Sequence, residues 1–591
     1  MKCTIKLCFF IFLIFTIKTS FAQDSTITRF VSLTNTKDTL VSSVIDLDDF
    51  QSYRFKHTPF LASSGNIGLP TMHLDQVNLP SYNGFFQGYS SSLLTKEGLK
   101  FYNQEKDVTL LQYTNGAQSE QYFKVFHSNQ FGEGLNLSFD YNRIISQGFY
   151  VNQLTDNTHF NSTLNYNSRN DKYHLKIGYL ISNIKTQENG GVNYSDSTDE
   201  NINSSTLVPF NLSSATHHLR SQTVVLDQSF LIADSSFFKQ VKLYHQLDMS
   251  WSWKRYKDLG GQEFYEKFYI DSSSTFDSIN YSKVSNSFGF SILDNLIRLD
   301  YSYEFHDYYQ NSTFDTLYTS QFINASLFKQ FGKLSAEFNF KQGISGFNQN
   351  DFDQNLNLRY DLDSNNKVLL ALKNTRLTPY YWQNRFSGNH VFYIKQFDDQ
   401  DKLFARLSFV NKHYNYSLGI EVDQSSNLIV YNSSAEPFQY SKSVNRILVN
   451  LRKNFDFGNF QFNNDLNYQY IDNLEVLPLP SIFTSHSLFY QNSFFEEKLF
   501  TQIGVDARYI GNYDGYGYFP ESSVFTIQDQ RELGDFVYLD VFIKFRIQHV
   551  RVFAKMENLL GNQFEPKGMM INNYGIPGRV FKIGLSWAMF N

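Results

Sequence analysis

Apolar and polar residues alternate along most of this chain, and this period-two pattern constrains the fold more than any other feature. From 297 to 305 every second residue is apolar, and Arg298, Asp300 and Glu304 stand between them. In a strand, such spacing places all the apolar side chains on one face. The stretches are long beside the roughly five to six residues of a typical globular strand. The same alternation recurs at 173–179, 334–340, 416–422, 503–509 and 581–589.

Aromatic residues indicate that the apolar face meets lipid. The chain has 60 Phe and 39 Tyr, and aromatics make up 17% of it, yet the mean hydropathy is only -0.38. That combination fits a sheet with an apolar outer face and a wet inner face. Aromatic rings also stand at the ends of stripes, as in the interfacial girdles of membrane barrels. They are Tyr173, Tyr179, Trp251, Trp253, Tyr468, Tyr470 and Trp587.

A soluble β-sandwich or propeller would also alternate, but its strands would be shorter and its inner face would carry fewer full charges. A helical membrane protein is excluded, because the longest aliphatic stretch beyond the N-terminus is Val368–Leu372 and a spanning helix needs roughly 18 apolar residues. We therefore predict an all-β protein. It is a transmembrane antiparallel β-barrel of the outer-membrane type, with an even number of strands, roughly 16–22.

The first 22 residues are predicted to be a cleaved signal peptide. Positive charge and a long apolar run occupy residues 2–17, and Ser20–Ala22 forms a small-x-small cleavage site. Both cysteines of the chain, Cys3 and Cys8, fall in this segment. The exported protein is therefore expected to lack disulfides and thiol or zinc–thiolate chemistry. We expect it in the outer membrane of a Gram-negative bacterium.

The rest of the chain divides into a leader and a barrel. Residues 23–100 alternate weakly and are predicted to be an N-terminal leader, either periplasmic or inside the lumen; residues 101–591 are predicted to be the barrel. Connections of two sizes match short periplasmic turns and long outer loops. The short ones include 168–171, 363–366, 458–459, 496–497 and 548–549, and the long ones are 189–220, 257–283 and 512–535.

Charged residues on the polar faces are the candidate site. A Lys or Arg facing the lipid midplane costs about 2–4 kcal/mol, so these side chains should face the lumen. They are Arg298, Asp300, Glu304, Glu337, Lys341, Lys544 and Arg546. Together they could form a selective constriction. For each residue, however, the favoured interpretation is that it solvates a wide wall and pairs with a neighbouring charge.

No other motif indicates chemistry. The adjacent His217 and His218 are expected to be a solvated loop pair rather than a metal site. The sequence has no phosphate loop, zinc-ligand spacing or dinucleotide turn. We expect no catalytic, cofactor or metal site, and the mild negative charge, -6 for the whole chain, argues against binding nucleic acid.

The last stripe is predicted to be the strand that closes the barrel against an early strand and directs assembly. Its residues are Phe581, Ile583, Leu585, Trp587, Met589 and, on the opposite face, Phe590. Barrels of the outer membrane commonly end in an aromatic residue, whereas this chain ends in Asn591. We hypothesise that Trp587 supplies the interfacial anchor instead. Expected partners are outer-membrane lipid, the barrel-assembly machinery and small solutes; the oligomeric state is left open.

Several segments, in order, resemble the putative porin family of the Bacteroidota. They are Phe55–Phe60 with Gly65–Pro70, Gln121–Gln130 with Gly134–Asn136, Ser146–Gln153 with Glu188–Gly191, Gly504–Tyr509, Glu557–Leu559 and Pro577–Arg579. The resemblance spans most of the chain beyond the signal peptide. It implies an outer-membrane barrel that passes small solutes by passive diffusion.

Two alternatives stay open. The last hairpin is also similar to that of TonB-dependent transporters, which would make the protein a substrate-specific transporter. Such a transporter needs a plug domain, and residues 23–100 look too short and irregular for one. A structural or adhesive barrel acting through its long outer loops is the second alternative.

The signal peptide should be cleaved between Ala22 and Gln23, because the small-x-small site follows the apolar run directly. N-terminal sequencing of the protein purified from outer membranes should then begin at Gln23. A chain that still contains Cys3 or Cys8 would contradict both the cleavage site and the absence of cysteine from the exported protein.

Overall fold

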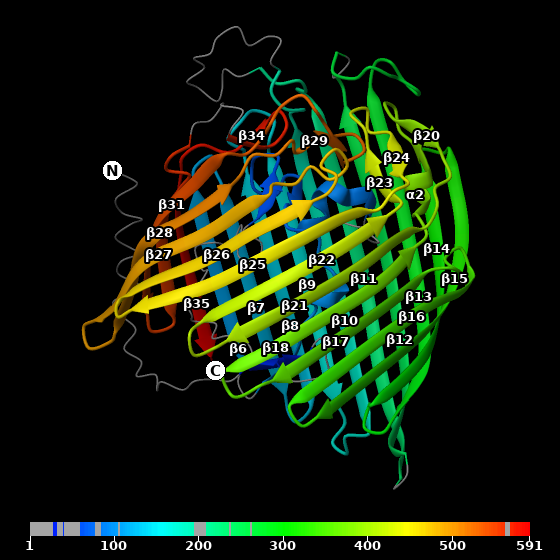
Figure 1. Ribbon diagram of the computed structural model, residues 1–591, viewed down its shortest axis with the longest axis vertical. Coiled ribbons are helices and arrows are strands. Elements are labelled where there is room, and N and C mark those ends of the chain that lie inside the picture. Colours follow the sequence, from blue (N-terminus) through cyan, green and yellow to red (C-terminus); the bar gives the residue numbers. More distant parts are fainter. Residues whose placement is uncertain are drawn as a thin grey trace.

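In the computed structural model, 22 antiparallel strands close into one barrel, and each wall strand pairs with the next one along the chain (Figure 1). The structure describes residues 28–31, 39–40, 60–76, 84–104, 107–193, 209–235, 238–260, 263–561 and 568–590. The predicted barrel and its even strand number are confirmed, at the upper end of the expected range. The predicted signal peptide, residues 1–22, lies outside the described residues.

The wall strands are well defined by continuous pairing. The first half comprises β6 (Val108–Gly116), β7 (Gln121–Phe131), β8 (Leu135–Ser146), β9 (Thr155–Asn167), β10 (Tyr173–Glu188), β11 (Ala215–Ser235), β12 (Lys239–Asp258), β13 (Thr275–Ile292), β14 (Ile297–Gln310), β15 (Phe314–Phe331) and β16 (Leu334–Gly346). The second half comprises β17 (Phe352–Asp361), β18 (Asn366–Leu377), β21 (Gln400–Asn411), β22 (Tyr416–Ser426), β25 (Val444–Phe457), β26 (Phe460–Ile471), β27 (Ile482–Phe494), β28 (Leu499–Ile510), β31 (Phe536–Ile547), β32 (Val550–Glu557) and β35 (Val580–Phe590).

Strand β14 shows how the wall is oriented. Its apolar stripe, Leu299, Tyr301, Tyr303 and Phe305, is 37–42% exposed on the outside of the barrel. The alternating residues Ser302, Glu304 and His306 are buried on the inside. An apolar outer face and a polar inner face are what a sheet between lipid and an aqueous lumen requires.

The long connections all lie at one end of the barrel, although that end also has short turns at 117–120, 311–313 and 347–351 (Figure 1). The short turns that were predicted all lie at one end, which we call the short-turn end. The predicted long connection 189–220 is shorter, because β11 starts at Ala215, and that at 257–283 spans 259–274. In both places polar residues continue a long strand beyond the apolar band, so the alternation that marks a strand is lost.

The long connections at the other end, which we call the loop end, carry their own short elements. They are α2 (Tyr381–Asn384), β19 (Arg385–Ser387), β20 (Phe392–Ile394), β23 (Leu428–Tyr431), β24 (Pro437–Tyr440), β29 (Tyr516–Phe519), β30 (Val524–Ile527), β33 (Met569–Ile571) and β34 (Tyr574–Gly575). Within the described residues, no helix is long and apolar enough to span a membrane.

The N-terminal segment, described at 60–76 and 84–104, runs inside the barrel. Its elements are β3 (Leu61–Ser63), β4 (Thr71–His73), η1 (Gly84–Ser92), η2 (Lys96–Gly98) and β5 (Phe101–Gln104). The amide of Leu94 donates to the Ser182 hydroxyl at 3.0 Å, and the Thr163 hydroxyl donates to the Lys100 carbonyl at 2.9 Å. Strand β5 pairs with β1 (Thr28–Val31), which also pairs with β2 (Thr39–Leu40). The wall therefore begins at Val108, not at the predicted residue 101.

Strand β35 closes the barrel by pairing with β6, from Lys582 opposite Gly116 to Phe590 opposite Val108. The predicted pairing of the last strand with an early strand is thus confirmed. Trp587 is 40% exposed on the outer face, whereas Phe590 packs inside against the cluster that contains Val108.

Buried ion pairs bridge this closing seam on the inner face. The Lys582 ammonium lies 2.5 Å from Glu120 and 3.0 Å from Glu557. Lys555 lies 3.0 Å from Glu557 and 3.0 Å from Asp540, so the network crosses from β31 to the turn after β6. All these side chains are almost fully buried, and the Arg508 guanidinium, 3.3 Å from Asp540, balances the third carboxylate.

Replacing Lys582 by Met should destabilise the barrel by about 3–5 kcal/mol, because the buried carboxylates of Glu120 and Glu557 lose a shared counter-charge. The loss should appear as a lower temperature at which the compact, heat-modifiable form disappears on a gel. Lys172→Met, at an exposed short turn, is the matched control and should behave as the wild type. An unchanged transition in Lys582→Met would show that closure does not depend on this network.

Candidate functional site

The charged residues predicted to face the lumen lie on the inner face but do not gather at one place. Glu304 is the best connected of them, with Lys283 at 2.8 Å and Lys341 at 3.3 Å. Arg298 pairs with Asp300 at 3.4 Å. These contacts are ion pairs between neighbouring wall residues, the arrangement that the sequence analysis preferred to a single constriction.

The remaining predicted charges have other neighbours. Glu337 accepts from the amide of Asn339 at 2.9 Å. Lys544 and Arg546 lie elsewhere on the wall, with their cations over the rings of Phe542 and Phe500 at 4.7 Å and 5.1 Å.

Apolar side chains fill the interior at the loop end, which the sequence reasoning missed. One packed cluster joins the N-terminal segment to several long connections and to the inner wall. The N-terminal residues are Phe60, Ala62, Met72 and Leu74, and the connections add Leu428, Val430, Val476, Leu477, Leu479, Tyr513, Tyr516, Tyr518, Phe525, Leu533, Met569, Met570, Ile571, Tyr574 and Ile576. A core of this kind excludes water from the part of the lumen that it occupies.

A second cluster packs beside the first around helix η1. Phe86 and Tyr89 of η1, and Leu93 directly after it, pack with Trp382 and the residues of the β19–β20 hairpin. Inner-wall residues Ile184, Leu219, Ile279 and Tyr308 complete it. The N-terminal segment is therefore held between the wall and the inward-folded connections.

The β29–β30 hairpin crosses the interior and is held at its tip by the opposite wall. The Lys254 ammonium on β12 donates to the carbonyls of Glu521 at 3.1 Å and Ser522 at 2.8 Å. His217 on β11 donates through Nε2 to the Pro520 carbonyl at 2.6 Å. The Ser523 carbonyl accepts from the amide of Gly88 in η1 at 2.9 Å. We call residues 520–523 with these contacts the hairpin latch.

Glu521 is the acidic residue of the hairpin latch. Its side chain is fully buried and accepts from the His390 amide at 2.7 Å. Burial and the neighbouring Asp277 carboxylate raise the pKa of Glu521 well above its usual value, although Lys254 acts in the opposite direction. Protonation of this carboxyl therefore accompanies docking of the hairpin.

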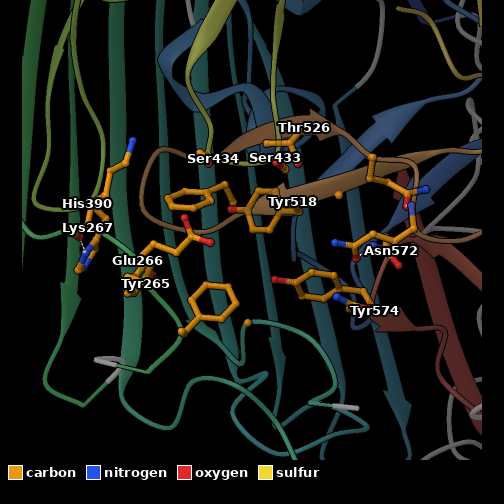
Figure 2. Close-up of a pocket in the computed structure, with 17 residues that line it drawn as sticks. Tyr265, Glu266, Lys267, His390, Ser433, Ser434, Tyr518, Thr526, Asn572 and Tyr574 are labelled. Atoms are coloured by element: carbon orange, nitrogen blue, oxygen red, sulfur yellow. Dashed lines mark hydrogen bonds between the residues drawn. The ribbon is translucent and has the colours of Figure 1, made fainter. Parts of the chain in front are cut away.

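A pocket of about 300 Å³ lies among the long connections beside this hairpin (Figure 2). Aromatic and polar side chains line it together: Phe264, Tyr265, Glu266, Lys267, His390, Ser433, Ser434, Tyr518, Phe519, Thr526, Gln528, Gln530, Asn572, Asn573 and Tyr574, with Gly190 and Gly517. Figure 2 shows Tyr265, Tyr518 and Tyr574 around one space. The volume is at the lower end of the range of small-molecule sites, about 300–1,000 Å³.

One wall of the pocket is rigidly built. The rings of Tyr265 and His390 stack with centroids 3.6 Å apart. The Lys267 carbonyl can only accept, so His390 donates to it through Nδ1 at 2.9 Å and accepts the Thr275 hydroxyl on Nε2 at 2.6 Å. Burial lowers the pKa of His390, in agreement with this neutral tautomer.

Two buried polar atoms of the pocket have no hydrogen-bond partner in the protein. They are Oδ1 of Asn572 and the hydroxyl of Tyr574, whose residues are 5% and 4% exposed. The amide nitrogen of Asn572 is already used, because it donates to Gln530 at 3.1 Å. Buried polar groups are normally satisfied, so these two need an explanation.

The adjacent histidines lie in strand β11 and not in a loop as predicted. His217 points inward to the hairpin latch, and His218 points the other way, where it meets Asn183 at 2.9 Å and the Trp253 ring. Across the part of the chain that the structure describes, no three His, Cys, Asp or Glu side chains are grouped to hold a metal ion.

The sequence matches a family described as "Putative porin" over residues 23–591. The chain belongs to this family. Comparison with curated protein sequences gives no match.

The barrel is also similar to solved structures. These include the FrpB iron transporter of Neisseria meningitidis (TM-score 0.57, 11% identity, 82% of each chain) and the ferric enterobactin receptor PfeA of Pseudomonas aeruginosa (0.59, 10%, 84% of this chain and 83% of that one). A third is the siderophore receptor PirA of Acinetobacter baumannii (0.56, 10%, 84% and 82%). At these identities the likeness supports the outer-membrane barrel fold alone.

Docking of the β29–β30 hairpin should weaken as the pH rises. A free Glu has a pKa of about 4.3, and docking raises the pKa of Glu521 above this value. Docking is therefore strongest below about pH 4.3, and it is lost as the pH rises through the raised pKa of the docked state. We compare the rate of thiol labelling of Ser522→Cys with the rate for the exposed Asp529→Cys. The ratio of the first rate to the second should increase with pH. Glu521→Gln cannot ionise and should remove this dependence; a ratio that still rises in that variant would assign it to another group.

Proposed function

We propose that this protein carries a small polar solute across the outer membrane through a barrel that is closed at rest. The observation that carries the proposal is the apolar core inside the loop end, where the N-terminal segment and the β29–β30 hairpin meet. A water-filled pore at this level would leave those side chains in water, which is unfavourable. Transport then requires that the hairpin, the N-terminal segment, or both move.

The short-turn end of the interior supports a polar route below this closure. A cavity of about 520 Å³ lies there against the inner wall. Three guanidinium groups line it, those of Arg359, Arg406 and Arg452. Each pairs with a carboxylate of the wall, at 2.9 Å, 3.1 Å and 2.9 Å. Such a surface holds water and favours polar solutes.

A passive porin is the second candidate, and the family match favours it. In that case the apolar core would open spontaneously often enough for small solutes to diffuse through, and no ligand would be needed. The fold shared with the iron transporter and the siderophore receptors instead supports a substrate-specific transporter. The two candidate functions predict different resting conductances: large for a passive porin and small for a barrel that is closed at rest.

Planar-bilayer recording should show rare openings for the wild-type protein and a large, steady conductance after residues 517–526 are replaced by two glycines. Lys254→Met should raise the open fraction, because the hairpin latch loses its main donor. The matched control is Lys373→Met, which removes an inner-wall ammonium paired with Asp353 at 3.1 Å, away from the hairpin. It should leave the open fraction unchanged.

Two results would overturn the closed-barrel proposal. A wild-type current as large as that of the hairpin replacement would establish an open, passive pore. Silence of every variant, with strand-rich circular dichroism showing that each is folded, would favour the structural or adhesive alternative.

A further inference from the structure

The pocket beside the hairpin combines features that select a ligand class. Aromatic rings offer flat apolar faces, while side-chain amides and hydroxyls offer paired donors and acceptors. The ammonium of Lys267 is 2.9 Å from the Glu436 carboxylate, so its charge is already compensated. Glu266 adds a carboxylate to the lining, so an anionic ligand finds little counter-charge here, and a wholly apolar ligand would leave the amides unpaired.

The two unpartnered atoms point to a ligand that both donates and accepts. Oδ1 of Asn572 can only accept, so it needs a donor from the ligand. The Tyr574 hydroxyl can do either, and in Figure 2 it points into the space bounded by Tyr265 and Tyr518. Leaving such groups unpaired in a buried site is unfavourable unless a ligand or water completes them.

We propose that this pocket binds a neutral carbohydrate of one or two sugar rings. A sugar has C–H faces that stack on aromatic rings and hydroxyl groups that donate and accept along its edge. The rings of Phe264 and Phe519, which are partly exposed in the lining, suit the first, and Asn572 with Tyr574 suits the second. The inference rests on the proposed transport function, because it names the solute class that the same barrel would take up.

The test uses the full-length protein in detergent and isothermal titration with cellobiose, maltose, lactose and N,N′-diacetylchitobiose, with digalacturonic acid as the charged comparison. We expect saturable binding of at least one neutral disaccharide. Tyr574→Phe removes a hydroxyl that has no protein partner, so it should keep or raise thermal stability while weakening binding about threefold to tenfold.

Tyr513→Phe is the matched control, since it removes a nearby buried hydroxyl that does have a partner, the Met570 carbonyl at 2.6 Å. It should lower the thermal transition and leave sugar affinity unchanged. Absence of binding to every neutral disaccharide, binding of the charged comparison alone, or unchanged affinity in Tyr574→Phe would each overturn the inference. Sugar binding without any change in bilayer current or solute flux would leave the pocket assignment standing and contradict transport instead.

Discussion

No backbone hydrogen-bonding group of the wall can be left unpaired in lipid, and the rest of the molecule depends on that constraint. The barrel must therefore be closed, and its last strand must pair with its first, as β35 pairs with β6. Closure in turn fixes which side chains point outward, because the side-chain period of a strand is two. The buried charges of Lys582 and Glu120 follow, since inward-facing side chains at the seam have only each other and the lumen as neighbours.

A barrel of 22 strands encloses far more space than its own inner side chains can fill. The space at the loop end is filled from two directions, by the N-terminal segment and by the long connections. Their apolar side chains cannot face water and cannot reach lipid, so they pack against one another inside the wall. The polar inner face and the dry internal core therefore coexist in one lumen, at different depths.

Sequence reasoning predicted the wall well because its signal is periodic. The stripe 297–305 and its charges lie as expected, since one misplaced residue would turn every side chain to the wrong face. The internal core could not be predicted in this way. Residues such as Phe60, Leu428 and Met569 lie in segments that lack a long alternating pattern and are far apart in the sequence, and only the closed barrel brings them together. The pocket shares this origin, because Tyr265 and Tyr574 come from different connections.

The pocket and the hairpin latch share one structural element, and this couples them. Tyr518 and Phe519 line the pocket, while Glu521, two residues further on, is held by the opposite wall. A ligand can shift the hairpin only if it binds the docked and undocked states with different affinity. The connection that carries Tyr574 is tied to the same hairpin, because the amide of Asn572 donates to the Tyr516 carbonyl at 2.8 Å and the rings of Tyr518 and Tyr574 lie 5.9 Å apart. A sugar in this pocket therefore contacts both parts, and it favours movement of the hairpin only where it binds the displaced arrangement more tightly than the docked one.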